Sequence, residues 1–162
     1  VKRQVPDKEI VIYDGACPSG NSVAMLNLLR LGRMTGEPAY EKQAGKLSAA
    51  FSNEVLSQPS AFTQLLMGVD FSISPSLELV IAGQKEGSDT RAMVKALSGA
   101  YLPHLVLLLR PEDGTASRIG KIAAFTRAQT ALNGQATAYV CSRFNCEEPT
   151  TDPEAMLRLL QR

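Results

Sequence analysis

Three short apolar runs in the second half of the chain constrain its fold more than any other feature. The runs are Leu77–Ala82, Leu105–Leu109 and Ala136–Val140, and each has the length and the apolar side chains of a strand. Helical patterns follow them, at 89–97, at 116–128 and from Asp152 to Leu160. Because buried parallel strands are continuous apolar runs joined by helical crossovers, the pattern predicts a small, three-stranded, mainly parallel sheet flanked by helices.

The composition of the chain changes around Ser74-Pro75-Ser76, and the residues before this point have helical periodicity. We therefore expect a mixed α/β fold with two substructures, a helical one at 1–75 and an α/β one at 76–162. Three strands make a small sheet. Its second face has to be covered by the helical half or by chain outside this sequence.

The helical half is expected to hold three helices. The first runs from about Asn21 to Met34, and its apolar residues cover most of its circumference. Such a helix has to be buried on more than one side. A second, one-sided helix is expected from Pro38 to Val55, and a shorter third helix begins near Pro59.

The composition excludes several classes of function. With a net charge of +1 and dispersed basic residues, the chain has no field that would attract nucleic acid. Its longest apolar stretches, such as Leu102–Leu109, are too short to cross a bilayer, so we expect a soluble, cytoplasmic protein without membrane contact.

Three cysteines at low density fit a reducing compartment, and no cofactor is expected. Because the sequence begins with Val, we expect it to be a piece of a longer polypeptide.

Several motifs resemble those of one known family. They are Asp14–Ser22, Leu28–Leu31, Tyr101–Pro103, Ala136–Cys141 with Cys146, and Pro149–Pro153. Together they closely resemble the C-terminal part of the spermatogenesis-associated protein 20 family, over almost the whole chain. That family combines a thioredoxin-like domain, an α/α toroid similar to six-hairpin glycosidases and N-acylglucosamine epimerases, and an α/β tail. The resemblance implies that this chain supplies the last toroid helices and the tail, whereas the thioredoxin-like domain is absent from it.

The polar loop Asp14–Ser22 has two interpretations. If the helices close a toroid, as the resemblance implies, loops at one end of its inner helices line the cavity. The candidate residues for binding a sugar-like ligand are then Asp14, Ser19, Asn21 and Ser22. Among them, Asp14 is the candidate for a catalytic acid or base, although no second carboxylate has a spacing that identifies it as its partner. Alternatively, the loop is a turn and a helix cap, which its turn-forming residues favour.

Two cysteines follow the third apolar run, at the end of a strand, where sheet proteins usually carry their chemistry. Cys141 and Cys146 are candidates for a thiol redox pair, although their spacing is not that of thioredoxin-type motifs. No metal site is expected, since Cys17 and the lone His104 fall at no recognised zinc spacing. The favoured interpretation is two packed, reduced thiols, because free cysteines are commonly buried and a cytosolic glutathione pool opposes an exposed disulfide. Their Cα atoms are expected to lie within about 7 Å of each other.

Three hypotheses about function remain, in this order. The first is a structural and interaction role in a larger protein, whose other toroid helices and thioredoxin-like domain are the expected partners. The second is an enzymatic role, in which the complete toroid processes a carbohydrate and Asp14 contributes to the site. The third is an accessory redox role for Cys141 and Cys146. Because toroid catalysis needs groups from several inner helices, we expect this chain alone to be inactive on sugars.

Overall fold

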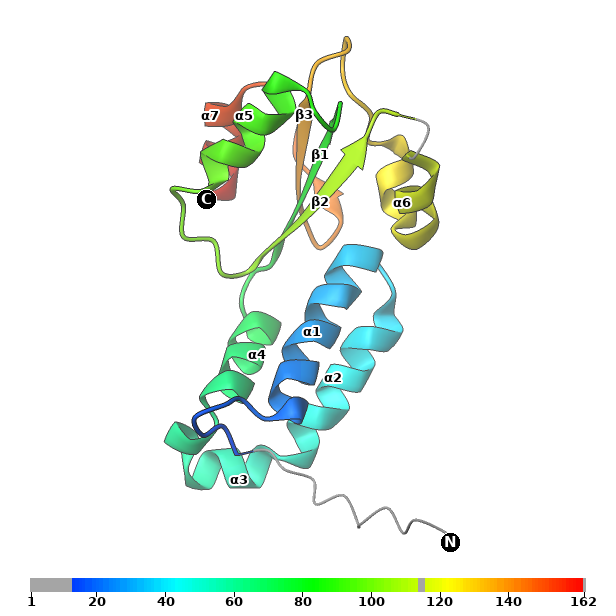
Figure 1. Cartoon of the computed structure of the whole chain (residues 1–162). Helices are drawn as coiled ribbons and strands as arrows, with labels where there is room; N and C mark the ends of the chain where they lie inside the picture. The colour runs from blue at the N-terminus through cyan, green and yellow to red at the C-terminus, as the bar shows by residue number, and fades with distance from the viewer. Residues whose placement is uncertain (1–12, 114–115, 162) are drawn as a thin grey trace, which may run out of the picture.

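The computed structural model describes residues 13–113 and 116–161, so residues 1–12 of the expected helical substructure lie outside the described part. The first half contains α1 (Gly20–Thr35), α2 (Pro38–Ala50), α3 (Ser52–Ser57), the 3-10 helix η1 (Pro59–Ala61) and α4 (Thr63–Ile73). The second half contains β1 (Leu77–Gly83), α5 (Ser88–Leu97), β2 (Leu105–Pro111), α6 (Ala116–Ile122), the 3-10 helix η2 (Ala124–Ala128), β3 (Thr137–Ser142), β4 (Asn145–Cys146) and α7 (Pro153–Leu160). In Figure 1, a layer of helices α1 to α4 lies at one end of the sheet. Helices α5 and α7 lie on one side of the sheet, and α6 lies on the other side. The mixed α/β class is therefore confirmed.

Helix α1 begins and ends where capping chemistry predicts. The Ser19 hydroxyl oxygen accepts a hydrogen bond from the backbone N–H of Ser22 at 3.0 Å, which satisfies one of the free donors of the first turn. At the other end, Gly36 has a φ of 74°, the left-handed conformation that glycine adopts at little cost, and its N–H bonds to the carbonyl of Gly32.

The helix packs between α2 and α4, and its buried residues join one core. The core of the helical layer consists of Met25, Leu26, Leu29, Ala44, Ala61, Phe62, Leu65, Phe71 and Val106. Two apolar residues of α1, Val23 and Leu31, nevertheless remain 38% and 40% exposed. Among the residues that the structure describes, α1 is thus covered by α2, by α4 and at β2, and its Val23 and Leu31 stay partly exposed.

The expected second helix is broken at Phe51. This residue has φ −117° and ψ 11°, so α2 ends before it and the short α3 restarts at Ser52. The Ser52 hydroxyl donates a hydrogen bond to the carbonyl of Ala49 at 3.1 Å, and such a side-chain bond competes with helix continuation. The one-sidedness is confirmed, since Ala44 is fully buried whereas most of α2 is exposed or half-buried.

The sheet has four strands in the order β2-β1-β3-β4, where three had been expected. Strands β1 and β2 are parallel as predicted, but β3 runs antiparallel to β1, so the sheet is mixed rather than mainly parallel. The helix expected over 116–128 is divided into α6 and the 3-10 helix η2, and the chain does not return along β2. It enters β3 at the end where β2 leaves, through a tight turn in which Asn133 and Gly134 both have positive φ.

Alternate residues of the central strand β1 face opposite sides of the sheet. Leu79 and Ile81 pack with Met93 of α5 and Met156 of α7 in a second core. Glu78 faces the other way, and its register partner on β3 is Cys141. The two side chains consequently share the face of the sheet on which the cysteine chemistry lies.

Candidate disulfide site

Cys141 and Cys146 are joined by a disulfide, with an S–S distance of 2.04 Å and a Cα–Cα distance of 3.8 Å. The expectation that the Cα atoms lie close together is confirmed, and the expectation of two reduced thiols is wrong. The physical reason is β4, which the sequence did not predict. This strand turns back on β3 and makes the two cysteines direct register partners, so their side chains stand side by side on one face.

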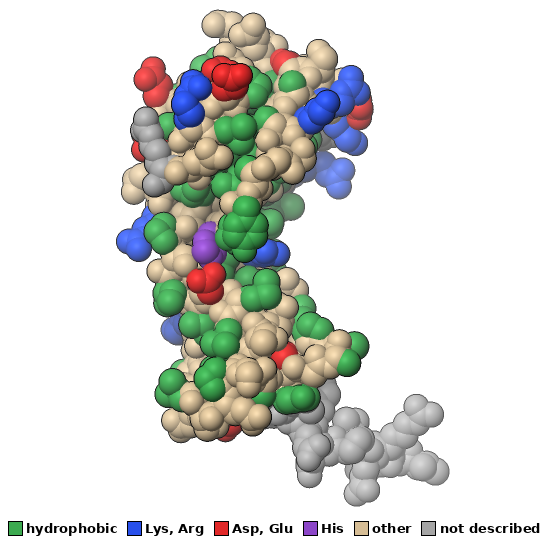
Figure 2. Space-filling view, turned by 90° about the vertical axis from the view of Figure 1, so that its left-hand side faces the viewer, with side chains coloured by type: hydrophobic (Ala, Val, Ile, Leu, Met, Phe, Trp, Pro, Cys, Tyr) green, Lys and Arg blue, Asp and Glu red, His purple; other side chains and the backbone are tan. Residues whose placement is uncertain are grey.

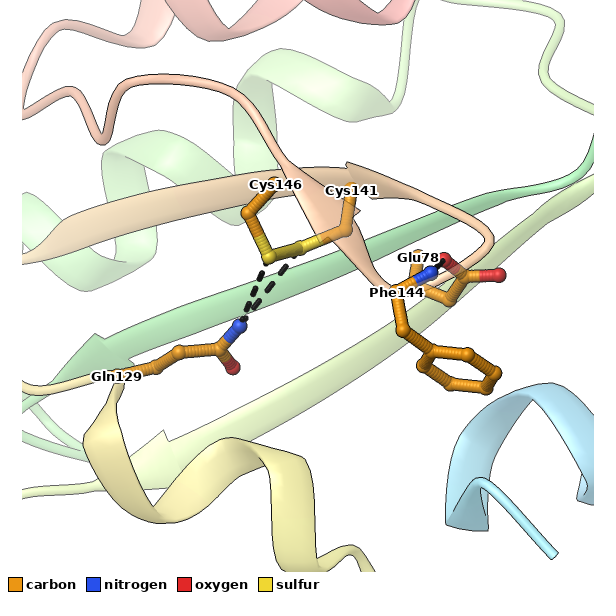
Figure 3. Close-up of a disulfide and its surroundings, with 5 residues drawn as sticks. All are labelled: Glu78, Gln129, Cys141, Phe144 and Cys146. Atoms are coloured by element: carbon orange, nitrogen blue, oxygen red, sulfur yellow. Dashed lines mark hydrogen bonds between the residues drawn. A yellow bond between two sulfur atoms is a disulfide. The ribbon is translucent and has the colours of Figure 1, made fainter.

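The turn between the cysteines has an unusual backbone. Arg143 and Phe144 have φ angles of 49° and 64°, a left-handed conformation that L-residues with side chains avoid. Figure 3 shows the contact that holds the turn, in which the backbone N–H of Phe144 donates to a carboxylate oxygen of Glu78 at 3.1 Å. The Phe144 ring also packs edge-on against Phe125 of η2, with ring centroids 5.2 Å apart. Neighbouring elements therefore fix this turn from outside the hairpin.

Glu78 is a fully buried carboxyl group in an otherwise apolar strand. Its burial raises the pKa of the carboxyl above the usual range, and this effect outweighs the hydrogen bond from Phe144 and the positive charge of Arg33. The nearest Arg33 nitrogen is 3.9 Å from Oε1, and Oε1 has no hydrogen-bond partner among the residues that the structure describes. Glu78 is the charged residue inside the apolar run Leu77–Ala82, and this position was the sequence signal for a buried carboxyl group. It was not among the predicted site residues.

Gln129 completes the site. Its side chain, 6% exposed, follows η2 and points its amide nitrogen at the disulfide, 3.4 Å from the sulfur of Cys146 and 3.6 Å from that of Cys141 (Figure 3). The amide oxygen Oε1 is buried and has no hydrogen-bond partner within residues 13–113 and 116–161. The two sulfurs differ in access, because Cys141 is 1% exposed whereas Cys146 lies at the surface. Nothing in the sequence around Gln129 marked it as a partner of the cysteines.

The polar loop links Asp14, Ser19 and Ser22 through hydrogen bonds. The carboxylate of Asp14 accepts hydrogen bonds from the backbone N–H of Ser19 at 2.8 Å and of Leu65 at 3.0 Å. Ser19 and Ser22 are linked through their hydroxyls at 2.8 Å, and Asn21 lies in the first turn of α1. Burial alone would raise the pKa of Asp14, but these donated hydrogen bonds outweigh it and hold the pKa below the usual value. The carboxylate thus ties the start of α1 to the start of α4, and a role in ligand binding stays a prediction.

The remaining candidates lie apart from both clusters. His104 pairs with Asp70 at 2.6 Å, and this hydrogen bond is the main cause that lowers the pKa of Asp70. Cys17 is an exposed free cysteine. Within residues 13–113 and 116–161, no three His, Cys, Asp or Glu side chains are grouped closely enough to hold a metal ion. In the same part of the chain, no helix has both the length and the apolar character that a membrane span requires.

Fold and site together define a mixed α/β chain in which a helical layer supports a disulfide-bearing sheet. Comparison with curated proteins then shows 35% identity over 147 residues to spermatogenesis-associated protein 20 of Homo sapiens, and 30% identity over 149 residues to that of Rattus norvegicus and of Mus musculus. These matches confirm that the chain is similar to a part of the spermatogenesis-associated protein 20 family. They cover 91–92% of this chain but 19% of each relative, so the chain spans about a fifth of their length. No family model matches the chain, and no solved structure matches it.

Proposed function

We propose that the chain is a structural and interaction region of a larger protein, and that the rest of that polypeptide packs against the helical layer. The observation that carries the proposal is the apolar surface of this layer. Large apolar side chains exposed there are Val23, Leu31, Leu56, Met67 and Ile73, with exposed fractions from 38% to 78%. Figure 2 shows apolar side chains spread over the same end of the molecule.

The shape of the helical layer also supports packing of the rest of the polypeptide against it. An open cavity of about 420 Å³ lies between α2 and α4, above the α1 residues Met25 and Leu29. The α2 residues that line it are small, among them Ala44, Gly45 and Ser48, which would let another element approach closely. The relatives are about five times longer than the region that matches, since that region is 19% of their length, so chain able to fill these faces exists in proteins of this kind.

A double substitution on α1 tests the proposal. Val23→Ser with Leu31→Ser should lower the free energy of unfolding of the isolated chain by about 2 kcal/mol, because about three-fifths of each residue is already buried there. In the protein that contains the chain with its flanking sequence, the same change should cost about 2 kcal/mol more, since the remaining exposed part of both side chains would be buried as well.

The matched control is Val94→Ser on α5, an apolar residue that is 42% exposed but lies outside the helical layer. It should cost the same in both proteins. Equal effects of the α1 substitutions in the isolated chain and in the longer protein would contradict the proposed packing. Chemical denaturation followed by circular dichroism at 222 nm measures all of these values.

A second candidate function is favoured by the disulfide itself. We propose that Cys141 and Cys146 form an accessory redox pair that alternates between the disulfide and two thiols. The surface position of Cys146 and the polar amide of Gln129 beside both sulfurs support this role. The test counts free thiols of the native protein before and after incubation with dithiothreitol, in a Cys17→Ser background that removes the unpaired cysteine. A pair that stays oxidised until the protein is denatured would rule out a redox role.

A further inference from the structure

We infer that thiol–disulfide exchange at this pair has a fixed direction. Cys146 is the sulfur that an incoming thiolate attacks, Cys141 is the sulfur that leaves, and Gln129 is the residue that positions the leaving group. The inference rests on the redox role proposed for the pair and assigns a part in it to each side chain.

Access decides which sulfur is attacked. A thiolate must approach the sulfur it attacks from the side opposite the breaking bond, so a covered sulfur is protected. Cys141 is 1% exposed and lies in β3, between β1 and β4. Cys146 ends β4 at the edge of the sheet and belongs to the exposed residues. The incoming sulfur can therefore reach Cys146, and the electrons of the broken bond go to Cys141.

The amide of Gln129 fits both states of the leaving sulfur. In the disulfide, sulfur can only accept hydrogen bonds, and the amide nitrogen donates toward both sulfurs while the amide oxygen is left without a donor. When Cys141 leaves as a thiolate, the same N–H donors stabilise its negative charge. Because a thiolate accepts a hydrogen bond more strongly than a disulfide sulfur does, the N–H donors of Gln129 favour the reduced state.

The proposed reductant is a dithiol, which supplies both attacking thiolates. Its first thiolate attacks Cys146, forms a mixed disulfide with it and breaks the Cys141–Cys146 bond, so that Cys141 leaves as a thiolate. The second thiolate of the reductant then attacks its own sulfur in the mixed disulfide and releases Cys146 as a thiolate. Both released thiolates take protons from water. Two electrons pass from the dithiol, which becomes a disulfide, to the protein.

Trapping the first step tests the direction. The Cys17→Ser protein is treated with glutathione, a monothiol, in the presence of excess N-ethylmaleimide, which blocks free thiols as they form, before peptide mapping by mass spectrometry. We expect glutathione on Cys146 and the alkyl group on Cys141 in at least about nine of ten trapped molecules. Glutathione found mainly on Cys141, or equally on both, would overturn the assignment.

Two measurements test Gln129. Gln129→Leu should slow reduction by dithiothreitol about tenfold, the loss expected for one hydrogen bond to a developing thiolate. It should also shift the equilibrium in a dithiothreitol redox buffer toward the disulfide by a similar factor, which a merely structural role would not do. Gln135→Leu, at an exposed position, is the matched control and should match the parent protein in both assays. Unchanged rate and equilibrium in a folded Gln129→Leu protein would overturn the role of Gln129.

The failures can be told apart. If the native parent protein is not reduced by dithiothreitol, the redox role fails and the inference fails with it. If the parent is reduced but the adduct forms on Cys141, the redox role stands and the direction fails. If Gln129→Leu does not fold, Gln129→Asn replaces it, because the shorter amide moves both polar atoms away from the sulfurs while keeping the group polar.

Discussion

Removal of the Asp14 carboxylate should destabilise the helical layer severely. The side chain is 8% exposed and accepts two backbone hydrogen bonds, from Ser19 at the start of α1 and from Leu65 in the first turn of α4. Asp14→Ala leaves both donors buried without a partner, and each such donor costs about 1–3 kcal/mol. Because water can enter the space left by the carboxylate, we expect a total loss of about 2–4 kcal/mol. Asp14→Asn keeps one acceptor oxygen and should lose about half as much.

Urea unfolding followed by circular dichroism measures the loss, with Glu148→Ala at an exposed acidic position as the control. The pKa of Asp14 is lowered in the folded state, so its contribution is fully present above the unfolded value of about 3.8 and is lost as the pH falls through the folded value. The difference between parent and Asp14→Ala should therefore shrink as the pH falls below about 4. A loss below about 0.5 kcal/mol at pH 7 would refute this structural role of Asp14.

Three further changes give sharp expectations. The pKa of Glu78 is raised by burial, so the free energy of unfolding of the parent should fall as the pH rises from about 4.5 through that raised pKa. Glu78→Gln should remove this decline. Parallel dependences on pH in parent and variant would contradict the expectation. Gly83→Ala would place its Cβ 2.4 Å from the Thr90 hydroxyl oxygen and 3.2 Å from the Cα of Ala136, and it should cost about 2 kcal/mol, of which Thr90→Ala should restore only the part due to Thr90 in the double variant. Gly36→Ala should cost about 1 kcal/mol because φ is 74° there, and an unchanged denaturation midpoint would show that the helix end relaxes.

The elements of the fold could largely be predicted from local signals, whereas the direction of one strand could not. The apolar runs and the proline and glycine positions marked the first three strands and most helix ends to within a few residues. The direction of β3 depends on where the connection after β2 ends, and one continuous crossover helix over 116–128 was predicted where the structure has α6 and η2. The pair Asn133-Gly134 was an available signal, since this dipeptide favours the tight turn that precedes β3.

The sequence predicted the two cysteines as a candidate site, but it did not predict that they form a disulfide. Strand β4 consists of two residues, and its turn contains Arg143 and Phe144, which have none of the usual features of a left-handed turn. The contact that holds this turn comes from Glu78, which lies 66 positions before Phe144 in the sequence. A local pattern cannot encode such a contact. The oxidised state followed from the register between the strands, which depends on that distant support.

Strand β2 contributes to both halves of the molecule. Val106 is 2% exposed and belongs to the core of the helical layer, while its neighbour Leu105 packs against the core beneath α5 and α7. Severing the chain at Pro75 would therefore strip the helical layer of a core residue that lies beyond the cut. The two halves are coupled through alternate side chains of a single strand, so they should melt together in one cooperative transition. We therefore expect that neither half folds alone and that a truncation series across this boundary yields no stable intermediate.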